Sequence, residues 1–105
     1  MIEIEESNGN IYADLEIPNA EEMLIKAQLA AKIAEIIKER HWTQHEAADV
    51  LGITQPKLSR MLQGQFRGIS EIKMLDCLTK LGRSIKIYVG PDQQSTGQME
   101  VEFAS

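Results

Sequence analysis

The sequence predicts a mostly α-helical domain of four to five helices, with a short C-terminal β-strand and a weakly structured acidic N-terminal arm. Three observations predict it. Apolar residues repeat at helical spacing through most of the chain. Several of these segments begin at a capping residue and stop at a glycine. Near the C-terminus, Ile85, Ile87 and Val89 alternate with polar residues, as in a strand. We therefore expect an arm at 1–18, a folded domain at 19–90 and a tail at 91–105.

The composition is typical of one small cytoplasmic domain. The chain has 105 residues, of which 43% are hydrophobic, enough for a single modest core. Its apolar runs are far shorter than the roughly 20 residues of a membrane span, and no basic-then-apolar leader begins the chain. The single cysteine, Cys77, excludes an internal disulfide and a cysteine-based zinc cluster. We expect it to be a small buried hydrophobe.

The charges are unevenly distributed along the chain. The formal net charge of −5 is the wrong sign for a protein that holds phosphates. Residues 1–22 carry seven acids and no base, whereas residues 40–90 carry eight bases and four acids. The acids of the first stretch are Glu3, Glu5, Glu6, Asp14, Glu16, Glu21 and Glu22. An acidic arm is thus attached to a mildly basic body.

The first secure element is a long helix that ends near Arg40. Residues 2–15 suggest only a weak hairpin, or a segment that folds on a partner. Asn19 and Glu22 have the spacing of a capping box. After them, apolar residues repeat at helical spacing, with Lys and Glu on the other side. These are Leu24, Ala27, Leu29, Ala30, Ile33, Ala34, Ile36 and Ile37.

Two short capped helices follow, joined by a glycine turn. Thr43 and Glu46 form a second capping box, and Gly52 stops the helix because a left-handed C-terminal cap favours a residue without a Cβ. Ala47, Ala48, Val50 and Leu51 are expected to be its apolar side. Thr54 caps the next helix, which has Pro56 in its first turn and ends at Gly64.

The last helix begins after the cap Ser70 and ends at Gly82, with Ile72, Leu75, Leu78 and Leu81 expected to face inward. A strand is then predicted over 84–90, and Pro91 terminates it. A second short strand is possible at 98–104. The strand carrying Ile85, Ile87 and Val89 can serve either as the edge of a dimer or in a hairpin with 98–104, because sequence fixes strand register poorly.

The spacing within residues 43–64 predicts a helix-turn-helix unit. A small residue is needed where the second helix crosses the first, a glycine where the chain turns, and apolar residues where the two helices lock at a fixed angle. The unit begins at Gln44. Ala48 is the small residue, Gly52 is the glycine of the turn, and the apolar residues are Ile53, Leu58 and Met61. The second helix of such a unit is the one that reads DNA.

The outward residues of this second helix are the candidate DNA contacts. Gln55 has the amide geometry to pair with adenine, Arg60 suits guanine, and Ser59 can reach a base or a phosphate. Phosphate-backbone contacts are expected from Thr43, Gln44, Thr54, Lys57, Gln63 and Arg67. The alternative for these polar side chains is a solvated helix face without a ligand. No acid lies between Gln55 and Gly68, which favours DNA.

Neither an enzyme nor a metal or cofactor site is expected. No nucleophile, carboxylate pair or phosphate loop gathers on a plausible shared site. His41 and His45 are four residues apart, but a helix boundary falls between them and no further ligand completes a set.

Residues 43–64 closely resemble the Cro/repressor-type (XRE) family. The likeness extends over residues 11–90, through Tyr12 to Glu21, Gln55-Pro56, Leu81-Gly82 and the strand with Ile85 and Ile87, and there it resembles the subfamily that includes HigA-type antitoxins. The resemblance implies a lambda-repressor-like fold and a small bacterial or phage-derived repressor. It also implies a RelE-like toxin ribonuclease as a partner.

One such domain has too little charge and area to be specific, so a homodimer on an inverted-repeat operator is expected. An acidic arm would complement a basic ribonuclease, or it merely keeps the protein soluble. Two alternatives stay open: a stand-alone regulator without a toxin, and a helix-turn-helix fold used only for protein contacts.

Overall fold

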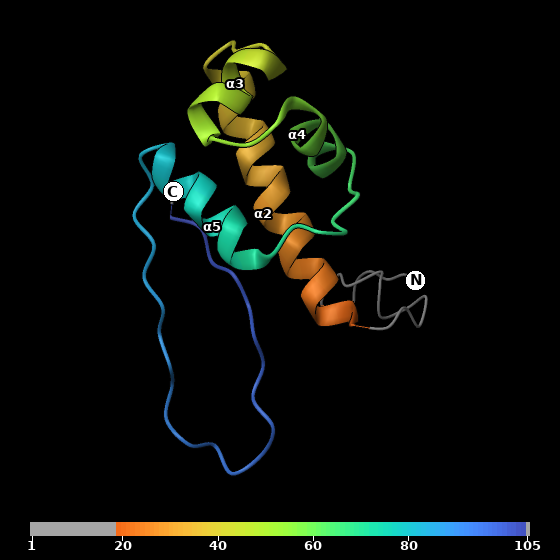
Figure 1. Ribbon diagram of the computed structural model, residues 1–105. Helices are drawn as coiled ribbons and strands as arrows, with labels where there is room; N and C mark the ends of the chain where they lie inside the picture. Colours follow the sequence, from red (N-terminus) through yellow and green to blue (C-terminus); the bar gives the residue numbers. More distant parts are fainter. Residues whose placement is uncertain (1–18, 105) are drawn as a thin grey trace.

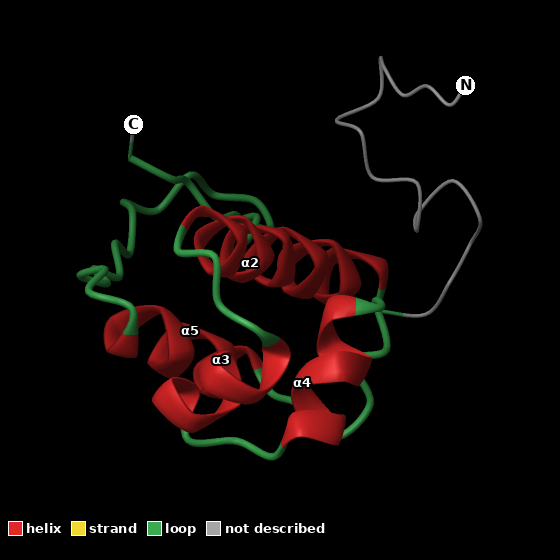
Figure 2. Ribbon diagram, turned by 90° about the horizontal axis from the view of Figure 1, so that it is seen from above, coloured by secondary structure: helices red, strands yellow, loops and turns green. Residues whose placement is uncertain are grey.

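The computed structural model describes residues 19–104, and four helices make up the body of this part of the chain (Figure 1). They are α2 (Ala20–Glu39), α3 (Gln44–Leu51), α4 (Gln55–Leu62) and α5 (Glu71–Lys80). Helix α2 packs against α4 and α5, and α3 packs against the same two helices. Figure 2 shows α3, α4 and α5 gathered on one side of α2. No fifth helix is seen within these residues, and the expected hairpin at 2–15 lies outside them.

Helix α2 forms as predicted, but its expected cap is wrong. Asn19 has a left-handed backbone, with φ of 60°, and its side chain makes no capping hydrogen bond. A capping side chain needs an extended backbone to reach the free amides of the first turn, so this conformation prevents the capping box. Glu22 instead pairs with Lys26, with 3.3 Å between Oε2 and Nζ.

The caps of the next three helices are confirmed. Thr43 and Glu46 form the complete capping box of α3, and Gly52 ends that helix in the left-handed conformation. The hydroxyls of Thr54 and Ser70 accept hydrogen bonds from the amides of Lys57 and Lys73. Each satisfied amide removes a donor that the helix cannot pair internally.

The core lies between α2 and the other three helices. Its fully buried side chains include Leu29, Ile33 and Ile36 of α2 and Leu81 after α5. Phe66 and Ile69, from the loop between α4 and α5, are buried as well, although no periodic pattern singled them out. Loop residues follow no helical repeat, so their burial depends on the tertiary fold.

Two of the expected inward residues prove to be exposed. Ile72 is 69% exposed and Val50 is 41% exposed. In α5 the buried residues are Met74, Cys77 and Leu78, continued by Leu81. Their spacing of three and four residues keeps one face inward, whereas the expected spacing of three throughout drifts around the helix. The prediction for Cys77 is confirmed, and burial raises the pKa of its thiol.

The predicted C-terminal strand is not seen. Within residues 19–104 no strand forms, and residues 83–104 make a long loop that leaves the end of α5 and returns to the helices (Figure 1). Ile85, Ile87 and Val89 are all exposed. A strand exists only when its backbone pairs with a neighbour, and the backbone of 84–90 has no hydrogen-bond partner in the described part of the chain.

The returning part of this loop lies along α2. The amide of Met99 donates to Oε2 of Glu21 at 3.1 Å, and Nζ of Lys32 lies 5.2 Å from the centre of the Phe103 ring. Val101, between them, packs on the core.

None of the four helices has the length and apolar character needed to cross a membrane.

Candidate nucleic-acid interface

Helices α3 and α4 are held together by side chains that are completely or almost completely buried. Leu51, Leu58 and Met61 are each at most 1% exposed, and Ala48 is buried at the crossing point. Ile53, in the turn, is half-buried against the same core. Because these contacts also involve α2 and α5, the angle between α3 and α4 is set by the whole core.

Gly52 makes the turn between these two helices in the left-handed conformation. Its backbone φ of +71° is one that residues with a Cβ rarely adopt. A Cβ built on it would also lie 3.1 Å from Nζ of Lys80, a residue of α5. The backbone conformation therefore favours glycine here, whereas the lysine tip could move aside for a Cβ.

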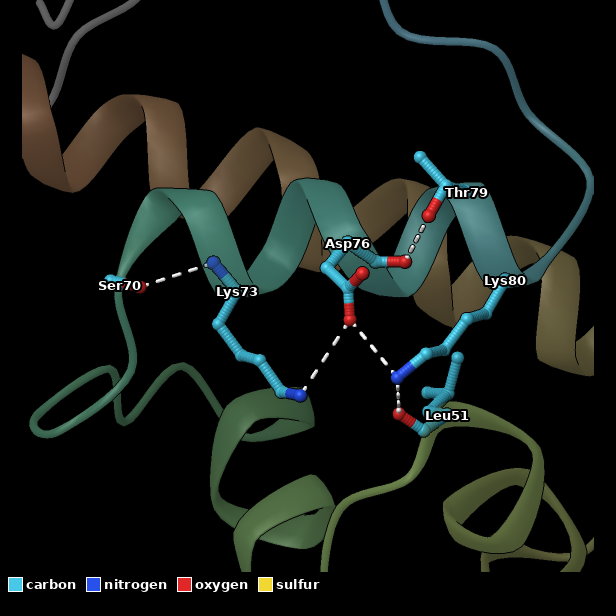
Figure 3. A network of polar contacts seen from close by, with 6 residues as sticks. All are labelled: Leu51, Ser70, Lys73, Asp76, Thr79 and Lys80. Carbon is cyan, nitrogen blue, oxygen red and sulfur yellow. Dashed lines mark hydrogen bonds and ion pairs between the residues drawn. The ribbon is translucent and has the colours of Figure 1, made fainter.

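Lys80 ties α5 to the end of α3. Its ammonium group donates to the carbonyl of Leu51 at 3.3 Å and pairs with Oδ2 of Asp76 at 3.0 Å (Figure 3). The carbonyls at the end of a helix lack internal partners, and a positive charge there also suits the helix dipole. Lys80 thus stabilises the end of α3 where the turn begins.

Asp76 holds Lys80 in this position and binds a second lysine. Nζ of Lys73 lies 3.6 Å from Oδ2 of Asp76, on the other side of the carboxylate (Figure 3). The hydrogen bond from Lys80 is the main cause that lowers the pKa of Asp76 below its ordinary value of 3.8. The charged carboxylate is therefore the form that the folded protein favours.

The outward side of α4 carries the side chains expected to read bases. Gln55 and Arg60 are exposed, and Ser59 lies between them, half-buried. The hydroxyl of Ser59 accepts a hydrogen bond of 3.2 Å from Nε2 of Gln63 one turn later. Residues 55, 59, 60 and 63 share one side of the helix, opposite Leu58 and Met61. The structure brings these four side chains together on one exposed surface.

The cations of this region are free of carboxylates. Lys57, Arg60 and Arg67 form no ion pair with any residue in 19–104. Four lysines of α2 and α5 differ, because Lys26, Lys32, Lys73 and Lys80 each pair with an acid, whereas Lys38 at the end of α2 does not within the same residues. Unpaired cations keep their full positive potential for a ligand.

The beginning of α3 offers two free backbone amides. The amide of Thr43 donates to Oε1 of Glu46 at 2.8 Å, and the hydroxyl of Thr43 accepts from the amide of Glu46 at 3.1 Å. The amides of Gln44 and His45, in the first turn, have no partner within the described residues. Such amides favour phosphate oxygens. Of the two residues expected to offer a free amide here, Gln44 does so, whereas the amide of Thr43 is occupied by Glu46.

Lys57 and Thr54 lie at the edge of this surface. Together with Gly52 and Lys73 they line a hollow beside the turn, and Lys57 is half-buried there. Arg67 follows α4 in the loop and is exposed. The three residues flank the outward side of α4 and are not part of its centre.

Comparison with known proteins gives a match that extends well beyond α3 and α4. The family described as a helix-turn-helix domain matches residues 11–90. This chain belongs to that family. A solved structure described as "Putative XRE Family Transcriptional Regulator" is similar to this helix-turn-helix protein with a TM-score of 0.71 and 27% identity. The similarity covers 84% of this chain and 99% of that one. The curated proteins include no match.

Two structural residues of the helix-turn-helix domain were missed by sequence reasoning. Neither Lys80 nor Arg40 was assigned a structural contact from the sequence, yet each donates to a carbonyl at the end of a helix. Nη2 of Arg40 lies 2.8 Å from the carbonyl oxygen of Leu81, and its guanidinium lies 5.1 Å from the centre of the Trp42 ring. The i,i+4 spacing of Asp76 and Lys80 predicts their ion pair, but nothing local predicts the long-range contact with Leu51.

The two histidines of the helix-turn-helix domain are not brought together as a ligand set. His45 pairs with Asp49 at 3.8 Å, and His41 lies in the turn before α3 with φ of 57°. Over residues 19–104, no group of three or more His, Cys, Asp or Glu side chains has an arrangement that could hold a metal ion.

The network at Asp76 makes a prediction about pH. Because its pKa is lowered, Asp76 is charged and holds Lys80 at neutral pH, and the contact is lost as the pH falls through the lowered pKa. In an NMR titration of the carboxyl carbon, we expect a midpoint below 3.8. Lys80→Met should raise this midpoint, and the control Lys73→Met should raise it less. A midpoint at or above 3.8 in the unmodified protein, or a larger effect from Lys73→Met, would contradict the network.

Proposed function

We propose that this helix-turn-helix protein is a sequence-specific DNA-binding transcriptional regulator that acts as a repressor, with α4 in the major groove. The observation that carries the proposal is the outward side of α4. It combines exposed amide and guanidinium groups with unpaired cations, and no acid occurs from Gln55 to Gly68. A helix fits the major groove, where each base pair presents a distinct pattern of donors and acceptors. The similarity to an XRE-family structure supports the same conclusion.

Base reading is assigned to Gln55, Ser59 and Arg60. Gln55 stands at the start of α4, the part of a recognition helix that enters the groove first. Its amide can pair with adenine through two hydrogen bonds, and Arg60 can pair with guanine in the same way. Ser59 already accepts a bond from Gln63, so its hydroxyl hydrogen is free to donate to a base or a phosphate.

Backbone contacts are assigned to the residues around this centre. The free amides at the start of α3, at Gln44 and His45, suit one phosphate. The side chains that surround the reading surface are polar or basic and would bind the phosphates on either side of the groove. They are Thr43, Gln44, Thr54, Lys57, Gln63 and Arg67. Such contacts position the protein without specifying sequence.

The active form is proposed to be a homodimer on an inverted-repeat operator. A single module of this kind buries only roughly 600–1,000 Å² on DNA and reads few base pairs. Two copies related by a two-fold axis read two half-sites about one helical turn apart. Specificity then comes from both copies acting together.

An antitoxin role in a type II toxin-antitoxin pair is proposed as the finer function. Two features of the sequence support it: the resemblance of residues 11–90 to the HigA-type subfamily, and the seven acids without a base in residues 1–22. An acidic segment complements the surface of a basic RNA-cleaving enzyme, such as a RelE-like ribonuclease. In this proposal one end of the chain inhibits the toxin, and the helix-turn-helix represses the operon of the pair.

The base-reading assignment is tested by two substitutions in α4. Selection from a random pool of duplex DNA gives the preferred site of the wild-type protein. On that site, Arg60→Ala should lose about 1–3 kcal/mol of binding and discriminate less between bases. Lys57→Ala should weaken binding to all sequences about equally. It should also reduce the slope of the logarithm of the binding constant against the logarithm of the salt concentration by about one. Lys26→Gln on α2 is the control, and it should leave binding unchanged.

Equal effects of Arg60→Ala and Lys57→Ala on specificity would contradict the assignment of Arg60 to base reading and of Lys57 to the phosphate backbone. If the fold served only protein contacts, the wild-type protein would select no DNA sequence from the pool. No salt-dependent binding to DNA would then be observed.

The antitoxin proposal is tested by deleting residues 1–18. The deletion removes five of the seven acids of the N-terminal stretch and leaves α3 and α4 intact. Co-expressed with the product of a neighbouring toxin-like reading frame, the shortened chain should neutralise toxicity less than the full chain, while its affinity for DNA changes little. Unchanged neutralisation would remove the arm from the mechanism, and a stand-alone regulator would neutralise no such product.

A further inference from the structure

The exposed apolar side chains of this molecule are concentrated on the loop after α5. Among residues 19–104, eight large hydrophobic side chains are exposed, and only Val50 and Ile72 lie on helices. The other six are Ile85, Ile87, Tyr88, Val89, Met99 and Phe103. Ile87, Tyr88 and Val89 are 74%, 82% and 87% exposed. Apolar groups gathered in this way on a small protein mark a surface that another molecule covers.

The loop has two limbs with different attachments. We define the outgoing limb as residues 83–90 and the returning limb as residues 98–104; Figure 1 shows them as the two sides of the open loop. The returning limb is fixed on α2 through Met99, Val101 and Phe103. The outgoing limb has no such support. From Ser84 to Gly90 its backbone makes no hydrogen bond to any described residue.

The tip of the loop keeps its own shape. The amide of Gln94 donates to Oδ1 of Asp92 at 2.7 Å, and Nε2 of Gln93 donates to the carbonyl of Thr96 at 3.1 Å. No backbone hydrogen bond joins the two limbs within residues 83–104. Apart from the amides of Arg83 and Met99, the backbone N–H and C=O groups of both limbs are unpaired among the described residues. Unpaired backbone groups of this kind are the feature that makes an edge pair with another chain.

The two limbs are complementary in pattern and in charge. Ile85, Ile87 and Val89 alternate with polar residues on the outgoing limb, and Met99, Val101 and Phe103 do so on the returning limb. The outgoing limb carries two bases, Arg83 and Lys86, and no acid. The returning limb carries two acids, Glu100 and Glu102, and no base. Side by side, they would match apolar faces and opposite charges.

We infer that the occupant of this surface is a second copy of the chain, and that two copies exchange limbs: the outgoing limb of each pairs with the returning limb of the other. Exchange forms two identical pairs of limbs that are related by a two-fold axis, so every limb in the two chains has a partner. This is the geometry of a closed dimer. Pairing of the two outgoing limbs with each other would instead bring two basic segments together. The inference rests on the proposed function only in giving an interface to the dimer proposed there.

Charge reversal tests the exchange directly. For the full chain without DNA, sedimentation equilibrium should give twice the monomer mass of 11.8 kDa. Lys86→Glu removes the net positive charge of the outgoing limb and places an acid against the acidic returning limb of its partner. The double variant Glu100→Lys/Glu102→Lys makes the returning limb repel the basic outgoing limb. We expect each variant alone to raise the dimer dissociation constant about tenfold or more, as like charges facing each other across two strands predict.

A mixture of the two variants should restore the dimer, because the glutamate introduced in one chain then faces the lysines introduced in the other, and the two unchanged limbs keep their opposite charges. If the two outgoing limbs paired, Glu100→Lys/Glu102→Lys would dimerise as the wild type does. If each chain closed its own hairpin, the mixture would not rescue. Either result, or a monomeric wild type, overturns the exchange.

A second pair of variants checks the apolar contribution. Ile87→Gln should raise the dissociation constant, whereas Ile72→Gln, an equally exposed position on α5, should not. Equal effects of the two would contradict the assigned surface. All variants should keep the helical circular dichroism of the wild type. Because the mass is measured without DNA, a failure here is separate from a failure to bind an operator.

Discussion

The structure depends on the burial of Leu51, Leu58 and Met61 at the junction of α3 and α4. These side chains lie in one core with α2 and α5, so the two short helices cannot change their angle without opening that core. Helices of eight residues are too short to be stable alone in water, and their position comes from packing. The outward side of α4 is available to a ligand because its inward side is fully used.

Polar contacts refine what the apolar core establishes. Lys80 joins α5 to the last carbonyl region of α3, just before Gly52 takes the left-handed conformation that starts the turn. Arg40 does the same for the end of α5. These cations serve the fold, whereas Lys57, Arg60 and Arg67 have no acidic partner in the described residues and can serve a phosphate or a base. An acidic protein can thus keep unpaired cations beside α4, where we propose that DNA binds.

Local chemistry made most of this fold predictable from the sequence. Thr43, Thr54 and Ser70 cap their helices, and Gly52 ends α3, because each of these effects needs only neighbouring residues. The errors arose where a neighbour far away in the sequence decides. Met74 and not Ile72 faces the core because α2 determines which side of α5 is covered, and the strand at 84–90 is not formed because it has no partner in the chain described. The candidate contacts on α4 could be chosen by elimination, but the bond between Gln63 and Ser59 and the role of Lys80 required the structure.

In the complex that we propose, DNA lies on the outward side of α4 and at the start of α3. The most direct measurement is an NMR titration of the backbone amides with a short duplex of arbitrary sequence at low salt, where non-specific binding is strong enough to observe. We expect the largest shifts at Gln44, His45 and the amides of residues 55–63 other than Pro56, and small shifts at Glu35 and Lys38 of α2. Shifts concentrated on α2 or on residues 83–104, with α4 unchanged, would contradict it.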